Sequence, residues 1–204
     1  NTINFSIKYD KIYKEVGGFL RIISGDKKGF KLKAPKGMDT RPTEDRVKES
    51  LFNILGTING DSIVLDLFSG SGSIGIEFLS RGAKFAYFID NSHLSISTIK
   101  ENISHTKFEE KSKIIKGDSI KIIKFLDREN IKFDYVYIDP PYGKNLIEKA
   151  LESISKIDIL NNNSLLILEH DKKKSFPETM YKFKKVDMRN YGHKVLTFYT
   201  YEEV

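Results

Sequence analysis

The chain of 204 residues contains no cysteine and only four histidines. Without cysteine, a disulfide scaffold, an iron–sulfur cluster and thiolate-bound zinc are excluded. The histidines are scattered along the chain, so we expect no metal site. No apolar run approaches the roughly 20 residues that span a bilayer, and no signal-peptide pattern is recognisable. We therefore expect a cytoplasmic protein that has no membrane segment.

The composition is that of a folded, basic protein. Hydrophobic residues make up 39% and charged residues 30%, which is a globular balance and excludes wholesale disorder. The length suits one domain, or one domain with a small appendage. The net charge is +6, and residues 21–36 alone carry a local charge of +5. Such a patch favours a polyanion such as nucleic acid, although a solvated lysine-rich surface would have the same composition.

The first part of the chain predicts a small basic attachment. Residues 1–18 show no clear periodicity and form an unassigned extension. Residues 20–23 and 30–33 are predicted to be two strands of a hairpin around a glycine-containing turn. Thr43 can cap a following helix, whose apolar positions recur at helical spacing up to residue 55. We therefore treat residues 19–57 as an RNA-contacting hairpin and helix.

Residues 58–204 show regular alternation of strands and helices. Strands are predicted at 63–68, 84–90, 113–117, 133–138 and 165–169, with helices at 72–81, 92–103, 119–129 and 144–155. Such alternation is typical of right-handed crossovers over a parallel sheet. Two further strands, 181–188 and 194–201, are joined by the short stretch 189–192 and predict an antiparallel edge hairpin. The fold class is therefore α/β, a doubly wound Rossmann-like sheet in one domain.

A glycine loop follows the first of these strands and opens a helix. Gly70, Gly72 and Gly75 have the G-x-G-x-x-G spacing, which permits a tight turn and close approach of the backbone to a nucleotide-type cofactor. The alternative is a purely structural turn with small residues that pack a helix against a sheet. The strand–turn–helix context favours the cofactor site.

Three carboxylates follow successive strands and select among cofactors. Asp90 can accept hydrogen bonds from ribose hydroxyls, which suits NAD and S-adenosylmethionine alike. Asp66 enters the loop, where its charge would repel a pyrophosphate and attract the sulfonium and ammonium of S-adenosylmethionine. Asp118 is placed to accept from the adenine amino group. Each Asp also has an alternative role as a helix cap or turn residue.

The stretch Asp139-Pro-Pro-Tyr142 follows the fourth strand. The two prolines, Pro140 and Pro141, fix the backbone and remove two N–H donors. The Asp139 carboxylate and the Pro140 carbonyl are then two acceptors for an exocyclic amine, whose lone pair they can expose for attack. Tyr142 can stack on an extruded base. The alternative for a lone Pro-Pro is a rigid turn, which the nearby glycine loop makes less favoured.

Together these motifs resemble the S-adenosylmethionine-dependent amino-methyltransferases of nucleic acids. More narrowly, the chain resembles the bacterial RsmD family, which methylates N2 of one guanine in 16S ribosomal RNA. The resemblance runs from about Leu20 to Tyr199. It rests on the glycine loop, on Asp139-Pro-Pro-Tyr142, and on the stretches Arg21-Ile-Ile-Ser-Gly25, Gly29-Phe-Lys-Leu32, Arg41-Pro-Thr43, Arg46-Val-Lys-Glu-Ser-Leu-Phe-Asn53, Leu79-Ser-Arg-Gly-Ala83 and Glu169-His-Asp171. The chain departs from the family pattern at Phe30, usually basic, and at Ser69, usually alanine.

The motifs and the resemblance together imply three sets of site residues and a partner. The catalytic set is Asp139, Pro140, Pro141 and Tyr142. The cofactor set is Asp66, Phe68, Gly70, Ser71, Gly72, Asp90, Asn91, Asp118 and Ser119. The RNA-binding set is Arg21, Lys27, Lys28, Lys31, Lys33, Arg41, Thr43 and Arg46. The partner is 16S rRNA, free or within an assembling small ribosomal subunit, and we expect a monomer.

Three alternatives stay open on the sequence alone. A DNA adenine-N6 methyltransferase uses the same four-residue motif, but only about 60 residues follow Tyr142, which leaves no room for a separate target-recognition domain. Protein glutamine methylation usually goes with Asn-Pro-Pro-Tyr, whereas residue 139 is Asp. A non-catalytic RNA-binding assembly factor could retain the fold, although the intact Asp66, Asp90 and Asp139 argue against it.

Overall fold

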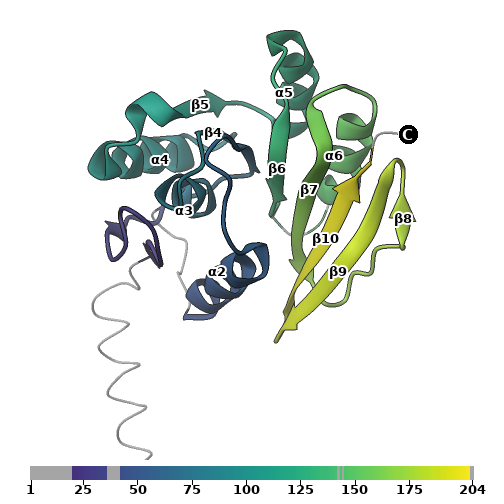
Figure 1. The fold of residues 1–204 in the computed structure, drawn as a ribbon, viewed down its shortest axis with the longest axis horizontal. Helices are drawn as coiled ribbons and strands as arrows, with labels where there is room; N and C mark the ends of the chain where they lie inside the picture. Colours follow the sequence, from purple (N-terminus) through teal and green to yellow (C-terminus); the bar gives the residue numbers. More distant parts are fainter. Residues whose placement is uncertain (1–19, 36–41, 142, 144, 203–204) are drawn as a thin grey trace, which may run out of the picture.

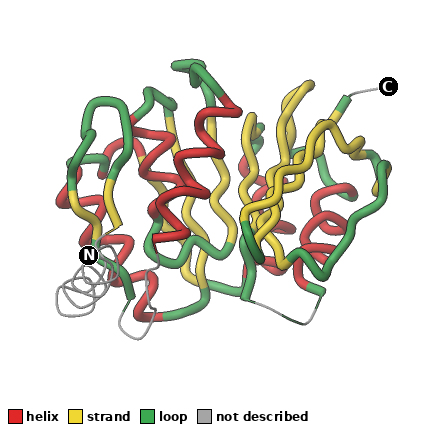
Figure 2. Tube along the Cα trace, turned by 90° about the horizontal axis from the view of Figure 1, so that it is seen from below, coloured by secondary structure: helices red, strands yellow, loops and turns green. Residues whose placement is uncertain are grey.

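A computed structural model of the chain describes residues 20–35, 42–141, 143 and 145–202. Within these residues the centre is an eight-stranded mixed sheet with the strand order β5-β4-β3-β6-β7-β10-β9-β8, next to a separate two-stranded hairpin (Figure 1). Helices lie on both faces of the large sheet (Figures 1 and 2). None of the helices in the described part of the chain has the length and apolar character needed to cross a bilayer.

The elements have the following bounds. The strands are β1 Leu20–Arg21, β2 Lys31–Leu32, β3 Ile63–Leu67, β4 Phe85–Asp90, β5 Ser112–Lys116, β6 Phe133–Ile138, β7 Leu160–Asp171, β8 Thr179–Met180, β9 Phe183–Tyr191 and β10 Lys194–Tyr201. The helices are α2 Pro42–Leu55, α3 Ser73–Ser80, α4 His93–Thr106, α5 Ser119–Leu126 and α6 Leu146–Ser155, with the 3-10 turns η1 Glu109–Lys111 and η2 Asp127–Glu129.

The chain reverses its direction of winding between β3 and β6. From β3 the sheet first grows through β4 to β5, and it then continues on the other side of β3 through β6 to β7, with all these neighbours parallel. Ligands of such sheets bind outside the carboxyl ends of the strands at this switch point. The fold therefore brings the segments after β3 and β6 together, which are the glycine loop and the Asp139 motif.

Two hydrophobic cores sandwich the sheet. Val64 of β3 faces one core, which also contains Phe78 of α3 and Ile99 of α4. The adjacent Leu65 faces the other core, which contains Leu151 of α6. Both cores are fully buried at these positions, as the near-continuous apolar sequence of a central parallel strand requires.

The hairpin β1–β2 and helix α2 pack on the first of these cores. Leu20, Leu32 and Leu51 belong to the same buried cluster as Phe78. The turn of the hairpin lies so close to the end of α3 that a Cβ on Gly25 would come within 1.8 Å of the Ser80 carbonyl oxygen. Gly25 also has a φ of +82°, so glycine is required there on both counts.

A fully buried carboxylate fixes this attachment. Glu77 of α3 accepts hydrogen bonds from the backbone N–H groups of Ile23 and Ser24, at 2.8 and 3.0 Å. Its charge is balanced by Arg81 at 2.9 Å and by Lys48 of α2 at 3.7 Å. Burial lowers the pKa of Lys48, while the Glu77 charge opposes that shift. One carboxylate thus ties together the hairpin, α2 and α3.

The predicted α/β class, the parallel core and the final antiparallel pair are confirmed. Helix α2 begins at Pro42 rather than after a Thr43 cap, and proline suits the first helical position. Helix α4 continues to Thr106, whose hydroxyl bonds the Asn102 carbonyl at 2.8 Å. The last hairpin turns at Gly192 and His193, where Gly192 has a φ of +65°. The short edge strand β8 was not predicted.

We expect Glu77→Gln to lower the free energy of unfolding by about 3 kcal/mol, because removal of one partner leaves buried charges uncompensated. Urea unfolding followed by circular dichroism measures this change. Glu101→Gln is the matched control, because Glu101 also pairs with a lysine, Lys33 at 2.7 Å, but on the exposed surface. Equal effects of the two substitutions would contradict the structural role of Glu77.

Candidate active site

The glycine loop after β3 is built around three residues in the left-handed region. Phe68, Gly70 and Gly72 have φ values of 62°, 56° and 77°. A Cβ on Gly70 would meet no atom within 4 Å, whereas one on Gly75 would lie 2.4 Å from the Phe88 ring. Gly70 and Gly72 therefore shape the loop, and Gly75 allows α3 to pack against β4. The structural interpretation of the motif is therefore present at Gly75, while cofactor binding by the loop stays a prediction.

Asp66 lies at the floor of this loop. Its side chain is almost completely buried, with 1% exposure, and one oxygen accepts a hydrogen bond from the Gly75 N–H at 3.1 Å. Burial raises the pKa of Asp66 to about 7; the Gly75 hydrogen bond opposes the shift, and the charge of Asp90 adds to it. Near neutral pH this carboxyl group is therefore poised between its two charge states.

Asp90 connects the glycine loop with the next strand. One carboxylate oxygen accepts from the Gly70 N–H at 2.9 Å and the other from the Ser92 N–H at 2.8 Å. Ser69 strengthens the same junction, because its hydroxyl donates to the Asp66 carbonyl at 2.6 Å and accepts from the Ile89 N–H at 2.9 Å. The chain's own hydrogen bonds therefore hold the loop in place.

The remaining members of the cofactor set surround this centre. Asp118 is exposed and caps α5 by accepting from the Lys121 N–H at 2.9 Å. The capping role that was one of its two interpretations is thus present, and its contact with adenine stays a prediction. Asn91 is exposed, Ser119 and Ser71 are buried, and Phe68 is half-buried.

The Asp139 motif begins where β6 ends. Leu67 of β3 pairs with Ile138 of β6, so Asp139 emerges beside the start of the glycine loop. Asp139 and Pro140 are half-buried and Pro141 is exposed, while Tyr142 lies outside the described residues. A pocket of about 220 Å³ opens beside the motif, and its lining includes Pro140, Pro141, Leu146 and Glu169.

Sequence reasoning assigned no role to a buried polar cluster behind this motif. The Tyr137 hydroxyl donates to one oxygen of Glu169, and the Lys194 ammonium donates to the other. Burial raises the pKa of Tyr137 well above its ordinary value, and the charges of Glu169 and Asp139 add to the effect. The sequence carries no local signal for this cluster, because its three residues come from β6, β7 and β10.

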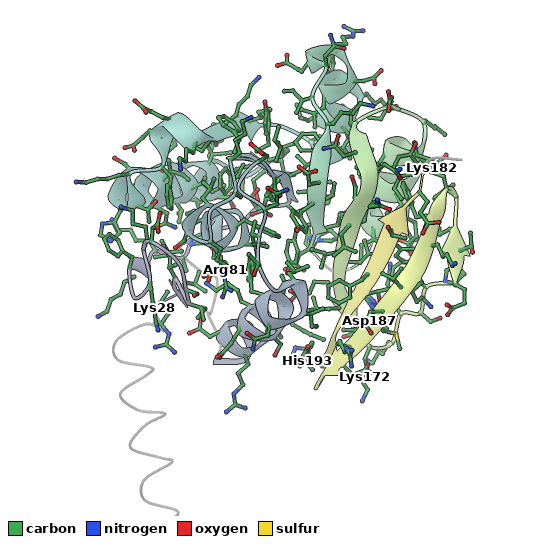
Figure 3. All side chains as sticks on the ribbon, in the orientation of Figure 1. Lys28, Arg81, Lys172, Lys182, Asp187 and His193 are labelled. Carbon is green, nitrogen blue, oxygen red and sulfur yellow. The ribbon has the colours of Figure 1, made fainter. Side chains whose placement is uncertain are left out.

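Most of the predicted RNA-binding residues gather on the hairpin and α2. Arg21, Lys28, Lys31, Lys33 and Arg46 are exposed, and Lys27 is half-buried. Figure 3 shows Lys28 at the outer side of the hairpin and Arg81 between the hairpin and α2. Arg41 lies outside the described residues, and the side chain of Thr43 is likewise not described.

Asn102 of α4 joins this basic hairpin to the glycine loop. Its amide oxygen accepts from the Lys33 N–H at 2.8 Å, and its amide nitrogen donates to the Lys33 and Ser71 carbonyls, both at 2.9 Å. Asn102 is buried, with 1% exposure. The surface predicted to bind RNA and the loop predicted to bind the cofactor therefore share one rigid connection.

The chemistry of the loop suits S-adenosylmethionine. Asp66 and Asp90 offer carboxylate oxygens, and the Gly70 N–H that could bind a phosphate already donates to Asp90. Carboxylates attract an ammonium or sulfonium, accept from ribose hydroxyls and repel a pyrophosphate. Asp66 and Asp90, with the open space at Gly70, fit that cofactor better than a dinucleotide.

Comparisons with known proteins agree with this geometry. The family model described as Conserved hypothetical protein 95 matches residues 20–200. The Ribosomal RNA small subunit methyltransferase D of Haemophilus influenzae is 37% identical over 158 residues, which is 77% of this chain and 81% of that protein.

Solved structures show the same fold. The crystal structure of a provisionally assigned methylase from Haemophilus influenzae covers 91% of this chain and 100% of its own, with a TM-score of 0.75 and 31% identity. A provisionally assigned methyltransferase solved in complex with SAH covers 79% of this chain and 50% of its own, with a TM-score of 0.61. At 17% identity the latter is a likeness of fold.

The buried Asp66 should make stability depend on pH. Because the folded protein holds this proton up to about pH 7, against 3.8 for an ordinary Asp, protonated Asp66 stabilises the fold at low pH. This contribution is lost as the pH rises through about 7. Between pH 5 and pH 8 we expect the wild type to lose about 2–3 kcal/mol more than Asp66→Asn, whose amide stays neutral. Urea unfolding at both pH values tests this, and parallel pH profiles would contradict it.

Proposed function

This chain belongs to the RsmD family of methyltransferases, and from that premise we propose that it transfers a methyl group from S-adenosylmethionine to the exocyclic N2 of a guanine in 16S rRNA. The observation that carries the proposal is the emergence of Asp139 beside the glycine loop at the switch point between β3 and β6. An amine held by Asp139 would there lie next to a cofactor held by the loop. The name of the Haemophilus influenzae relative supports small-subunit rRNA as the substrate.

In this proposal the cofactor lies across the carboxyl ends of β3, β4 and β5. Asp66 faces its positively charged end, Asp90 accepts from the ribose and Asp118 from the adenine amino group. Gly70 and Gly72 let the backbone approach, while Phe68, Ser71, Asn91 and Ser119 complete the surroundings. A cation beside Asp66 favours the ionised carboxylate, so binding should draw Asp66 from its poised state to the charged one.

The residues of this chain would prepare the target amine for attack. A guanine amino group is a poor nucleophile because its lone pair is delocalised into the ring. The Asp139 carboxylate and the Pro140 carbonyl accept its two hydrogens, which favours a pyramidal nitrogen with an exposed lone pair. Tyr142 is proposed to stack on the flipped base. Pro141 keeps the backbone rigid and adds no competing donor.

Positioning then carries most of the rate enhancement. When bound, S-adenosylmethionine supplies a methyl group activated by a sulfonium. The guanine nitrogen would bond to that methyl carbon while the carbon–sulfur bond breaks and its electrons stay on sulfur. The spare proton of the nitrogen would then pass to solvent. Asp139 holds the amine through this step without acting as a strong base.

The alternatives have less support. The DNA adenine-N6 hypothesis receives no support from the Haemophilus influenzae relative, whose name refers to ribosomal RNA. A non-catalytic assembly factor would not need the buried Asp66 and the pre-arranged Asp90, which hold a loop suited to a cofactor. Calorimetric titration with S-adenosylmethionine separates the proposed enzyme from an assembly factor, because a non-catalytic scaffold need not bind this cofactor.

The direct test uses 16S rRNA and small ribosomal subunits from cells that lack the gene. Purified protein and labelled S-adenosylmethionine should yield N2-methylguanosine, identified by mass spectrometry of the nucleosides. Methylated adenine, or no transfer to either substrate, would refute the proposal.

We expect Asp139→Ala to reduce single-turnover methyl transfer by at least about 10²–10³-fold, because removal of one preorganised electrostatic interaction has roughly that effect. Its affinity for S-adenosylmethionine should stay near that of the wild type. Asp90→Ala is the contrasting variant and should weaken cofactor binding by about 1–3 kcal/mol. Wild-type turnover by Asp139→Ala would rule out the amine-holding role.

The hairpin lysines should bind RNA without reading its sequence. Replacing Lys27, Lys28, Lys31 and Lys33 by Gln should reduce the slope of log affinity against log salt by up to about 0.7–0.9 for each phosphate that is no longer neutralised. The matched control replaces four exposed lysines of the α5 and α6 region, Lys121, Lys124, Lys149 and Lys156, which removes equal charge. Equal slopes for the two variants would show that the hairpin is only a solvated surface.

A further inference from the structure

Glu169 is a buried acid near the end of β7 for which the proposed mechanism has no use. Its residue is 5% exposed. β6 and β7 pair in parallel as far as Ile138 and Leu168, so Asp139 and Glu169 each follow directly after the last paired residue. The hydrogen bond from the Tyr137 hydroxyl to Glu169 shows that the Glu169 side chain lies on the same face of the sheet as that of Tyr137. Two carboxylates thus follow the last paired residues of two neighbouring strands.

The Glu169 carboxylate is held in a defined orientation. Tyr137 donates to one of its oxygens and Lys194 to the other. Lys194 comes from β10, which pairs with β7 antiparallel. A carboxylate has about four acceptor sites, so these two donors leave each oxygen able to accept one more hydrogen. A buried ion pair adds little stability over apolar packing, so stability alone does not account for the pair that Glu169 forms with Lys194.

Two neighbouring carboxylates match the two neighbouring donors on the Watson–Crick edge of guanine. In guanine the N2 amino group lies next to the N1–H, so two neighbouring ring positions both present donors. In adenine the ring nitrogen next to the amino group is an acceptor. A carboxylate beside Asp139 therefore suits guanine, and it would oppose the lone pair of an adenine ring nitrogen.

We propose that Glu169 is the specificity-determining residue of this enzyme and accepts the N1–H of the target guanine while Asp139 holds its N2 amino group. This inference rests on the proposed function, whose amine-holding residue it extends. Tyr137 and Lys194 are positioning residues, because they orient the Glu169 carboxylate without contacting the base. Flipped bases are read in this way, through hydrogen bonds to their Watson–Crick edge.

The test compares two substrates that differ at N1. The target guanosine, first located by mass spectrometry, is replaced by 2-aminopurine riboside through splinted ligation of 16S rRNA, with assembly into small subunits where those are the substrate. 2-Aminopurine keeps the reactive amino group and lacks the N1–H. Its loss of O6 affects wild type and variants alike, so the change in preference between enzymes reports on N1.

We expect the wild type to prefer guanosine by at least about 10²-fold in kcat/KM, since a site built to bind an N–H strongly rejects an analogue without it. Glu169→Gln should reduce that preference about 10- to 100-fold, the range for one hydrogen bond to a charged group, and should retain activity on 2-aminopurine. Tyr137→Phe keeps the carboxylate but removes one of the two donors that orient it, so the preference should fall by about threefold, less than in Glu169→Gln. Glu178→Gln is the matched control, because Glu178 also pairs with a lysine, Lys185 at 2.9 Å.

A wild-type enzyme that methylates both substrates equally would overturn the proposal even if Glu169→Gln does not fold, which circular dichroism would show. A folded Glu169→Gln that loses activity equally on both substrates would make Glu169 a structural residue and would also overturn it. Failure of the proposed function gives a different result, because the wild type would then methylate neither guanosine nor 2-aminopurine.

Discussion

The parallel pairing of β3 with β6 is the constraint on which the candidate site depends. Asp66 pairs with Tyr137, and Leu67 pairs with Ile138. Since both strands end at the same edge, the loop after β3 and the motif after β6 emerge together although they are far apart in the sequence. A slip of one residue would turn the side chains of β6 to the opposite face. The apolar side chains that alternate between two buried cores fix this register, so hydrophobic packing also aligns the chemistry.

Buried carboxylates recur at each junction of the molecule. Glu77 joins the hairpin to α3, Asp66 underlies the glycine loop, and Glu169 stands behind the Asp139 motif. Among the described residues, every buried side-chain nitrogen or oxygen has a hydrogen-bond partner. The partners differ in kind: cations balance Glu77 and Glu169, whereas a backbone N–H bonds Asp66. Burial raises the pKa of Asp66 to about 7, and a carboxyl group with no cation beside it in the part of the chain that the structure describes suits the proposed binding of a cationic cofactor.

The order of strands and helices and the two motif loops could be predicted from the sequence, because apolar periodicity and glycine spacing are local properties. Contacts between distant residues could not. Asp118 shows the limit within one residue, since the same side chain suits a helix cap and a ligand contact, and the structure shows the cap. Glu169 shows a second limit of sequence analysis, because its contacts depend on the register of β6 against β7 and on Lys194 from β10. Strand β8 has only two residues, too few for any periodicity to appear.

The connection through Asn102 links the two halves of the proposed reaction. Its side chain bonds Lys33 at the end of the hairpin and Ser71 in the glycine loop, and Ser80 and Glu77 hold the other side of the hairpin to α3. A hairpin attached at both sides cannot shift on RNA without moving α3 or the loop, or breaking buried hydrogen bonds. Because the hairpin is rigidly attached, a phosphate that it holds would fix the position of the target base relative to the Asp139 motif. The proposed RNA surface and the Asp139 motif would then lie at a fixed distance from each other, which α3, α4 and the sheet determine.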